Sequence, residues 1–112
     1  MNKQIEFSEI KDFAVWVKKN YGYNINGGLF SHSLQYSLKL EILKKFAIEV
    51  RKIYIIIEPY KNKNSELGWN VSWCGLKTFN DTYKSFMPTI MYVDCDSPED
   101  ALEKGLLNAL KL

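Results

Sequence analysis

The sequence contains few of the residues that cross-link small secreted domains or bind metal ions. Its 112 residues include two cysteines, three prolines and one histidine. Cys74 and Cys95 are too few for a disulfide framework, and their spacing is not that of paired zinc ligands. We therefore expect both to be buried or half-buried free thiols in a reducing compartment.

Long apolar runs are absent as well. No stretch approaches the roughly 20 consecutive apolar residues of a transmembrane helix, and the first six residues do not form a signal peptide. We therefore predict a cytoplasmic protein without a membrane partner. In contrast, 46% of the residues are hydrophobic, and three Trp, seven Tyr and six Phe make sixteen aromatic residues. This composition predicts one folded domain over residues 1–112 rather than a disordered chain.

The most hydrophobic stretch is residues 53–57, in which four isoleucines surround Tyr54, and Pro59 follows shortly after. A short β-branched run that is closed by proline is typical of a strand covered on both faces. Burial of each isoleucine should stabilise the fold by about 1.5–3 kcal/mol. We therefore predict that this strand lies at the centre of a small sheet.

Helices are predicted near both ends of the chain from their boundary residues. The first begins with Ser8 as its N-cap and ends before Gly22. The last begins with Ser97 as its N-cap and Pro98 in the first helical position. Their apolar stripes consist of Ile10, Phe13, Ala14, Val17 and Tyr21 in the first helix, and of Ala101, Leu102, Gly105, Leu106, Ala109 and Leu110 in the last.

The segment before the isoleucine-rich stretch is ambiguous, because residues 33–45 fit either a strand or a helix. Apolar and polar residues alternate from Leu34 to Ile42, as in a strand. However, residues 38–52 contain neither Gly nor Pro, and no turn signal divides them into two strands. We favour a helix over residues 33–51, with Ser31 or Ser33 as its N-cap.

Two further strands are predicted after the polar residues 59–66. Trp69, Val71 and Trp73 alternate with polar or small residues, which indicates a half-buried strand with its tryptophan face on the core. Residues 89–93 form a third strand that starts after Pro88, and residues 80–82 form a turn before it. The result is an α+β fold of order helix, helix, strand, strand, strand, helix, in which helices pack on one face of a three-stranded antiparallel sheet.

Residues that could support catalysis are sparse. His32 is the single histidine, and its neighbours Ser31 and Ser33 favour a loop or helix-cap position over a nucleophile–base pair. We therefore assign no catalytic or cofactor-binding residue, predict no cofactor, and expect a protein that is not an enzyme.

An acidic cluster precedes and begins the last helix. Its members are Asp94, Asp96, Glu99 and Asp100. Four carboxylates in such a cluster could converge on a hard cation. Acids also gather at a helix N-terminus because the helix dipole favours them there. We assign no metal ligand and leave open whether the cluster binds a cation.

Positive charge is concentrated in the first half of the chain. Residues 1–63 have eleven Lys/Arg and six Asp/Glu, a net charge of +5, whereas residues 64–112 have four and seven, a net charge of −3. A run of basic residues is most often a solvated surface, but it can also contact phosphates. The basic residues on the predicted second helix and on the loop after the first strand are Lys39, Lys44, Lys45, Arg51, Lys52, Lys61 and Lys63.

The C-terminal segment carries a family resemblance. Ile90-Met91-Tyr92-Val93 and the following DSPEDALEKGL of residues 96–106 resemble the closing strand and helix of HicB-type antitoxins. The whole chain is also similar in size and layout to small uncharacterised α+β proteins of phages and prophages of gut bacteria. The HicB resemblance implies an antitoxin-like role. Trp73-Cys74-Gly75-Leu76 stands in place of the Asp-Leu-Pro-Gly turn of that family, so no functional residue is carried over.

Together these features predict a small non-enzymatic module that binds another protein or a second copy of itself. Sixteen aromatic residues and an incompletely covered sheet leave room for an apolar interface. The alternative is a nucleic-acid-associated or antitoxin-like accessory protein that uses the basic second helix. A third possibility is an enzyme with a metal ion bound by the acidic cluster.

Overall fold

The computed structural model describes residues 5–112, except for the side chains of Lys77 and of residues 89–93. In this part of the chain the order of the main elements is α1 (Phe13–Tyr21), α2 (Tyr36–Phe46), β1 (Ile53–Lys61), β2 (Leu67–Gly75), β3 (Phe79–Asn80), β4 (Ser85–Phe86), β5 (Thr89–Cys95) and α3 (Pro98–Ala109). Short 3₁₀- or π-helical segments connect them: η1 (Phe7–Glu9), η2 (Leu29–Ser33), η3 (Ala47–Arg51) and η4 (Leu76–Thr78). The predicted α+β class is confirmed, and β3 and β4 add a small hairpin to the predicted order.

The isoleucine-rich strand β1 lies at an edge of the sheet. The strand order is β1-β2-β5, with both pairs antiparallel, so β2 is the central strand. Ile55 is 2% exposed on the side of the helices, whereas Tyr54 is 54% exposed. The prediction of a central strand that is covered on both faces is therefore wrong. Side chains alternate along a strand, so the long apolar run supplies one buried face and also places Ile56 on the opposite face.

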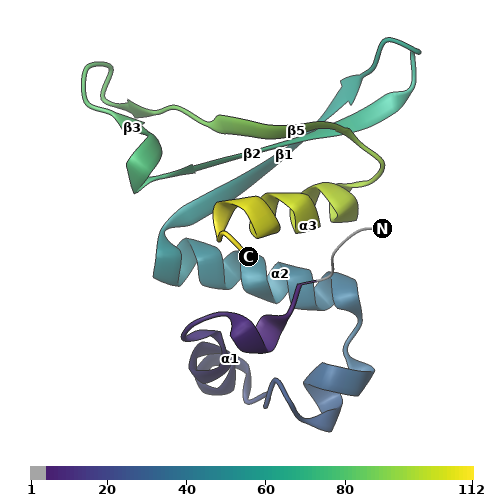
Figure 1. The fold of residues 1–112 in the computed structure, drawn as a ribbon, viewed down its shortest axis with the longest axis vertical. Coiled ribbons are helices and arrows are strands. Elements are labelled where there is room, and N and C mark those ends of the chain that lie inside the picture. The colour runs from purple at the N-terminus through teal and green to yellow at the C-terminus, as the bar shows by residue number, and fades with distance from the viewer. Residues whose placement is uncertain (1–4) are drawn as a thin grey trace.

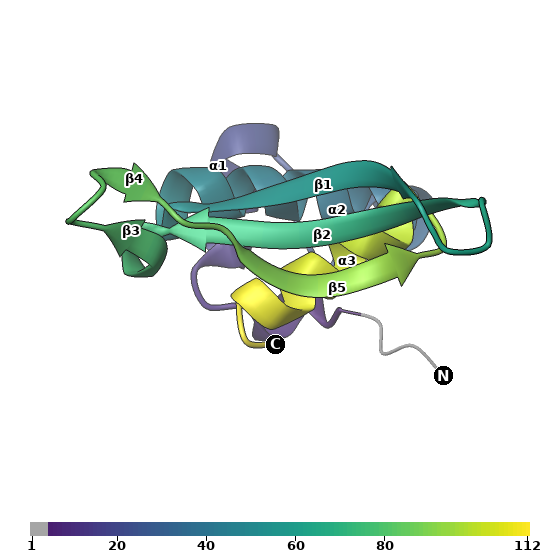
Figure 2. The ribbon, with the colours of Figure 1, turned by 90° about the horizontal axis from the view of Figure 1, so that it is seen from above.

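All three helices lie on the same side of this sheet, as Figure 1 shows. Helix α3 packs directly on β1, β2 and β5, α2 packs against α3, and α1 packs against α2 farther from the sheet. From above, the sheet lies over the helices, and no other described element covers the face toward the viewer (Figure 2). The predicted packing of helices on one face is confirmed.

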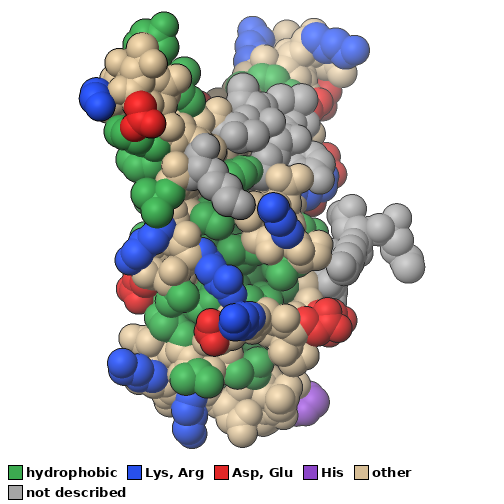
Figure 3. Space-filling model, turned by 60° about the vertical axis from the view of Figure 1, so that its left-hand side comes forward, with side chains coloured by type: hydrophobic (Ala, Val, Ile, Leu, Met, Phe, Trp, Pro, Cys, Tyr) green, Lys and Arg blue, Asp and Glu red, His purple; other side chains and the backbone are tan. Residues whose placement is uncertain are grey.

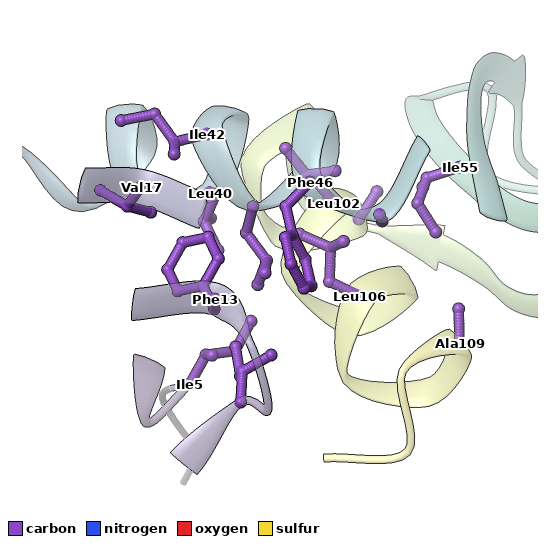
Figure 4. Close-up of a cluster of buried hydrophobic side chains, with 14 of the residues drawn as sticks. Ile5, Phe13, Val17, Leu40, Ile42, Phe46, Ile55, Leu102, Leu106 and Ala109 are labelled. Atoms are coloured by element: carbon purple, nitrogen blue, oxygen red, sulfur yellow. The ribbon is translucent and has the colours of Figure 1, made fainter. Parts of the chain in front are cut away.

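The hydrophobic core begins between the sheet and α3 and continues through α2 to α1 (Figure 4). Leu106, Phe13 and Phe46 are fully buried. The rings of Phe13 and Phe46 meet edge to face with their centroids 5.2 Å apart, a favourable aromatic geometry that joins α1 to α2. Trp69 and Trp73 pack against this core from β2, as their alternation predicts.

Helix boundaries were predicted with unequal success. Ser97 caps α3, because its Oγ accepts a hydrogen bond from the backbone N–H of Asp100 at 3.0 Å. Gly22 ends α1 in the left-handed conformation with φ of 75°, the geometry for which glycine is suited. The predicted start of the first helix is wrong, since Ser8 lies in η1 and α1 begins after Asp12, whose side chain makes no cap hydrogen bond.

The ambiguous segment is helical, as we favoured. It forms α2 and continues as η3 to Arg51, and Lys52 then adopts the left-handed conformation before β1 starts. The predicted caps Ser31 and Ser33 lie in η2 instead, and Gln35 occupies the N-cap position without a side-chain cap bond. The two-residue alternation did not produce a strand because Leu40 and Leu43, three residues apart, share the buried side of the helix.

Candidate binding surface

A hairpin of exposed apolar side chains projects from the sheet. We call residues 76–87 the apolar hairpin; they comprise η4, β3, the turn and β4, and end at Met87. Figure 1 shows β3 beyond one end of the β1-β2-β5 sheet, and the space-filling view shows hydrophobic side chains gathered on this projection at the upper left (Figure 3). Its exposed apolar side chains are Leu76 (74% exposed), Phe79 (38%), Tyr83 (73%), Phe86 (48%) and Met87 (51%).

Local hydrogen bonds shape this hairpin. The Thr78 hydroxyl accepts from the backbone N–H of Gly75 and donates to its carbonyl, both at 3.0 Å. The Met87 backbone N–H donates to the Thr78 carbonyl at 2.9 Å. The turn is closed by Asn80, whose side-chain oxygen accepts from the Tyr83 backbone N–H at 3.0 Å. The apolar side chains are thus held on an ordered backbone.

The turn of this hairpin was predicted from the sequence, but its two strands were not. Phe79 and Phe86 pair across β3 and β4, with their ring centroids 5.0 Å apart. Aromatic residues on both sides of a turn, here Phe79 before Asn80 and Phe86 after Lys84, are a hairpin signal, and this signal could have identified the segment. Single exposed apolar residues are ordinary on protein surfaces, whereas a contiguous group of them is typical of an interaction site.

The face of the sheet opposite the helices, which we call the open face, is a second accessible surface. Alternation along β1 places Tyr54, Ile56, Glu58 and Tyr60 on it. The residues that pair with these across β2 are Cys74, Ser72, Asn70 and Gly68. Apart from Glu58, the open face is therefore apolar or aromatic along β1, and it is small or polar along β2.

A polar contact closes one end of the open face. The Tyr60 ring and the Asp94 carboxylate both lie over Gly68, where an added Cβ would come 2.7 Å from Tyr60 Cε1 and 2.5 Å from Asp94 Oδ1. Asp94 Oδ1 also accepts a hydrogen bond from Asn62 Nδ2 at 3.1 Å. Partial desolvation, together with the charge of Asp94 and a hydrogen bond to it, raises the pKa of Tyr60.

The backbone of β5 explains why Asp94 points to this face. The pairs Trp69–Cys95 and Val71–Tyr92 advance two residues along β2 but three along β5. The extra residue forms a β-bulge, which re-aims side chains. Asp94 accordingly has a left-handed backbone, with φ of 58°.

The acidic cluster of the sequence analysis is divided by this arrangement. Asp94 turns to Asn62 and Tyr60, whereas Asp100 forms an ion pair of 3.1 Å with Lys104 and accepts from the backbone N–H of Asp96 at 3.4 Å. Among the described residues, no three His, Cys, Asp or Glu side chains form a group that could hold a metal ion. The Asp94 carboxylate thus contacts the β1–β2 turn, whereas the Asp100 carboxylate stays at the start of α3.

The basic residues are also divided between separate parts of the molecule. Lys61 ends β1 and Lys63 lies in the turn after it, away from α2 in Figure 1. Arg51 Nη2 donates to the carbonyl of Lys11 at 2.7 Å, and Lys39 Nζ donates to a carbonyl of η2 at 3.3 Å. Several of these cations therefore bind backbone carbonyls of neighbouring segments.

The histidine and the cysteines lie outside the two surfaces, except for one thiol. His32 is exposed in η2. Both cysteines are free; Cys74 is half-buried on the open face, and Cys95 is buried, which confirms the predicted environment of the thiols. Burial raises the pKa of the Cys95 thiol, so its reactive thiolate form is disfavoured.

Comparison of the chain with protein-family models, with curated proteins and with solved structures gives no match. The resemblance to HicB-type antitoxins and to phage-type proteins stays a prediction. Within residues 5–112, no helix has both the length and the apolar character needed to cross a membrane.

Proposed function

We propose that this chain is a non-enzymatic binding module that contacts a protein partner through the apolar hairpin. The observation that carries the proposal is the shared exposure of five large apolar side chains, from Leu76 to Met87, on one projecting hairpin. Apolar area that leaves water on binding contributes roughly 25 cal/mol per Å². A partner that covers this hairpin would therefore gain substantial binding free energy.

The residue types on the hairpin fit an interface core. Phe, Tyr and Met are enriched at the centres of protein–protein interfaces, whereas acidic residues and lysine are depleted there. Phe79, Phe86 and Met87 supply the apolar centre, and the charged Asp81 and Lys84 lie in the turn, where they would contact the rim. The partner surface that fits this arrangement is an apolar groove with polar margins.

The hydrogen bonds around Thr78 support the same proposal. They join both ends of the hairpin, through Gly75 and Met87, to one residue. Because a preorganised loop loses less conformational entropy on binding than a mobile one, this ordering favours a pre-shaped recognition element. The same exposed side chains on a disordered loop would bind with lower affinity.

The test is affinity capture from cells of the source organism with the full chain as bait. The wild type is compared with the double variant Tyr83→Ser/Met87→Ser, which removes exposed side chains without disturbing the core. Val15→Ser on α1 is the matched control, since Val15 is 73% exposed and lies away from the hairpin. Equal melting temperatures of all three chains establish that each is folded.

We expect the wild type and Val15→Ser to retain the same partner and the double variant to lose it. With purified partner, the double variant should bind at least about tenfold more weakly, because each interface side chain that matters contributes about 1–2 kcal/mol. Retention of the partner by the double variant, with unchanged affinity, would overturn the proposal.

A further inference from the structure

At the outer edge of β1, the backbone N–H and C=O groups of Ile53, Ile55 and Ile57 point away from β2. Ile53 and Ile57 are half-buried, and Ile55 is 2% exposed. In an antiparallel pair, successive residues direct these groups alternately toward and away from the neighbouring strand. The Asn62 N–H donates to the Glu66 carbonyl at 2.9 Å across the β1–β2 turn. Residues of even number in β1 therefore pair with β2, and those of odd number point outward.

Two further observations agree with this alternation. Gly75 lies opposite Ile53 in the register, but its N–H donates to Thr78 Oγ1 at 3.0 Å. The Gly75 N–H is therefore not hydrogen-bonded to the Ile53 carbonyl. Pro59, which has no N–H, occupies an odd-numbered position, where a missing donor leaves the pairing with β2 intact. Pro59 also marks where outward hydrogen bonding along β1 must stop.

The sequence of β1 is nearly self-complementary about Ile55. When a second β1 runs antiparallel with a two-fold axis at Ile55, facing residues have numbers that sum to 110. Ile53 then faces Ile57, and Tyr54 faces Ile56. At the margins this register brings Lys52, the left-handed residue just before β1, opposite Glu58. Both side chains are exposed, and Lys52 Nζ donates to the Glu49 carbonyl at 2.8 Å.

We infer that a second copy of this chain pairs with the outer edge of β1 in this register, so that the two sheets join into one. Across the two-fold axis, the N–H and C=O groups of Ile53, Ile55 and Ile57 bond to their counterparts. Tyr54 and Ile56 form aromatic–β-branched cross-strand pairs on the open face, which stabilise antiparallel strands. Beside them, the flexible side chain of Lys52 leaves the Glu49 carbonyl and meets Glu58 of the second copy as an opposite charge.

The charges select this register over its neighbours. Moving the two-fold axis to Tyr54 places Lys52 opposite Ile56, and moving it to Ile56 places Lys52 opposite Tyr60. In both shifted registers, neither Lys52 nor Glu58 therefore faces a residue of opposite charge. Protein sheets usually protect an edge strand with a central charge, a bulge or a covering segment, whereas here the charges of β1 and its margin flank an uninterrupted apolar centre.

This inference goes beyond the proposed function, because it concerns a different surface and a different partner. The apolar hairpin follows β2, whereas the dimer edge is the side of β1 that faces away from β2. Either proposal can therefore fail without the other, and the experiment below separates them.

The test is sedimentation equilibrium of the full chain over a range of concentrations. The wild type should approach twice the chain mass of 13.1 kDa. Glu58→Lys, which creates two Lys–Lys contacts by symmetry, should weaken association by about tenfold. The double variant Lys52→Glu/Glu58→Lys restores opposite charges and should return the dissociation constant to within about threefold of the wild-type value.

Four results would overturn the inference. The first is a wild-type chain that stays monomeric up to about 1 mM, the range of weak complexes. The second is a Glu58→Lys chain that associates as strongly as the wild type. The third is a double variant that fails to recover, although circular dichroism shows it to be folded. The fourth concerns the hairpin variant Tyr83→Ser/Met87→Ser, which should dimerise like the wild type; loss of its dimer would assign the contact to the apolar hairpin instead.

Discussion

The Tyr36 hydroxyl on α2 donates a hydrogen bond to the Glu103 carboxylate on α3 and accepts one from the Ile5 backbone N–H at 3.0 Å. Glu103 is only 8% exposed. A buried carboxylate is costly unless a donor satisfies it. The Tyr36 hydroxyl thus offsets the cost of burying the Glu103 carboxylate between α2 and α3. The same hydroxyl binds the N-terminal segment through the Ile5 N–H.

Replacement of Tyr36 by Phe should lower the free energy of unfolding by about 1–3 kcal/mol, because the Glu103 carboxylate loses this donor inside the protein. Urea denaturation measures the effect. Tyr83→Phe is the matched control, since Tyr83 is 73% exposed and loss of its hydroxyl should change stability by less than about 0.5 kcal/mol. Equal losses in both variants would contradict this role of Tyr36.

Alkaline pH should remove part of the Tyr36 contribution. Burial, followed by the hydrogen bond to Glu103, raises the pKa of Tyr36 above its ordinary value. Above about pH 10 the unfolded chain therefore releases a proton that the folded chain retains, so the stabilisation is complete below this pH and declines as the pH rises further. The difference in unfolding free energy between the wild type and Tyr36→Phe should shrink between about pH 9 and pH 11. A constant difference would contradict the shift.

Gly68 should resist substitution because two side chains lie over it. An alanine Cβ would come 2.5 Å from Asp94 Oδ1 and 2.7 Å from Tyr60 Cε1. Gly68→Ala should therefore destabilise the fold by about 1–3 kcal/mol as the Tyr60 ring and the Asp94 carboxylate move aside. Gly28→Ala is the control, since φ of −54° suits alanine and no heavy atom lies within 4 Å of its Cβ. It should be neutral or stabilising, and chemical denaturation compares the two.

The sequence predicted those elements whose signals are local. Ser97 and Pro98 determine where α3 begins through hydrogen-bonding groups within one turn, and Gly22 ends α1 through its own backbone conformation. Burial of Trp73 on one face of β2 also follows from simple alternation. In each case the residues that define the structure are neighbours in the sequence.

The errors concern relationships between distant segments. Whether β1 is central depends on which strand lies beside it, and composition does not encode this order: Ile56 fits the open face as well as a buried one. Ser8 has the chemistry of an N-cap, but the packing of η1 places the helix start after Asp12. The acidic cluster was divided by the bulge at Asp94, which no spacing rule revealed. The apolar hairpin was missed for a different reason, since Phe79 and Phe86 lie in strands of only two residues each.

The free energy of unfolding should distinguish Ser97, which caps α3, from Ser8, which was predicted to cap the first helix but does not. Ser97→Ala should lower the unfolding free energy by about 1 kcal/mol, because the Asp100 N–H loses its acceptor. Ser8→Ala should change it by less than about 0.5 kcal/mol, since the exposed Ser8 lies in η1 and caps no helix. Thermal and urea unfolding of both variants test this. A larger loss from Ser8→Ala would restore the helix start that the sequence suggested.

The proposed dimer depends on a sheet that keeps β1 at its edge. The most direct test is amide hydrogen exchange along β1, followed by NMR in the Glu58→Lys chain to limit self-association. We predict alternation, in which Tyr54 and Ile56 are protected by β2, while the half-buried Ile53 and Ile57 exchange faster because their N–H groups point away from β2. Equal and strong protection of these four amides in this chain would place β1 inside the sheet and contradict the proposed edge.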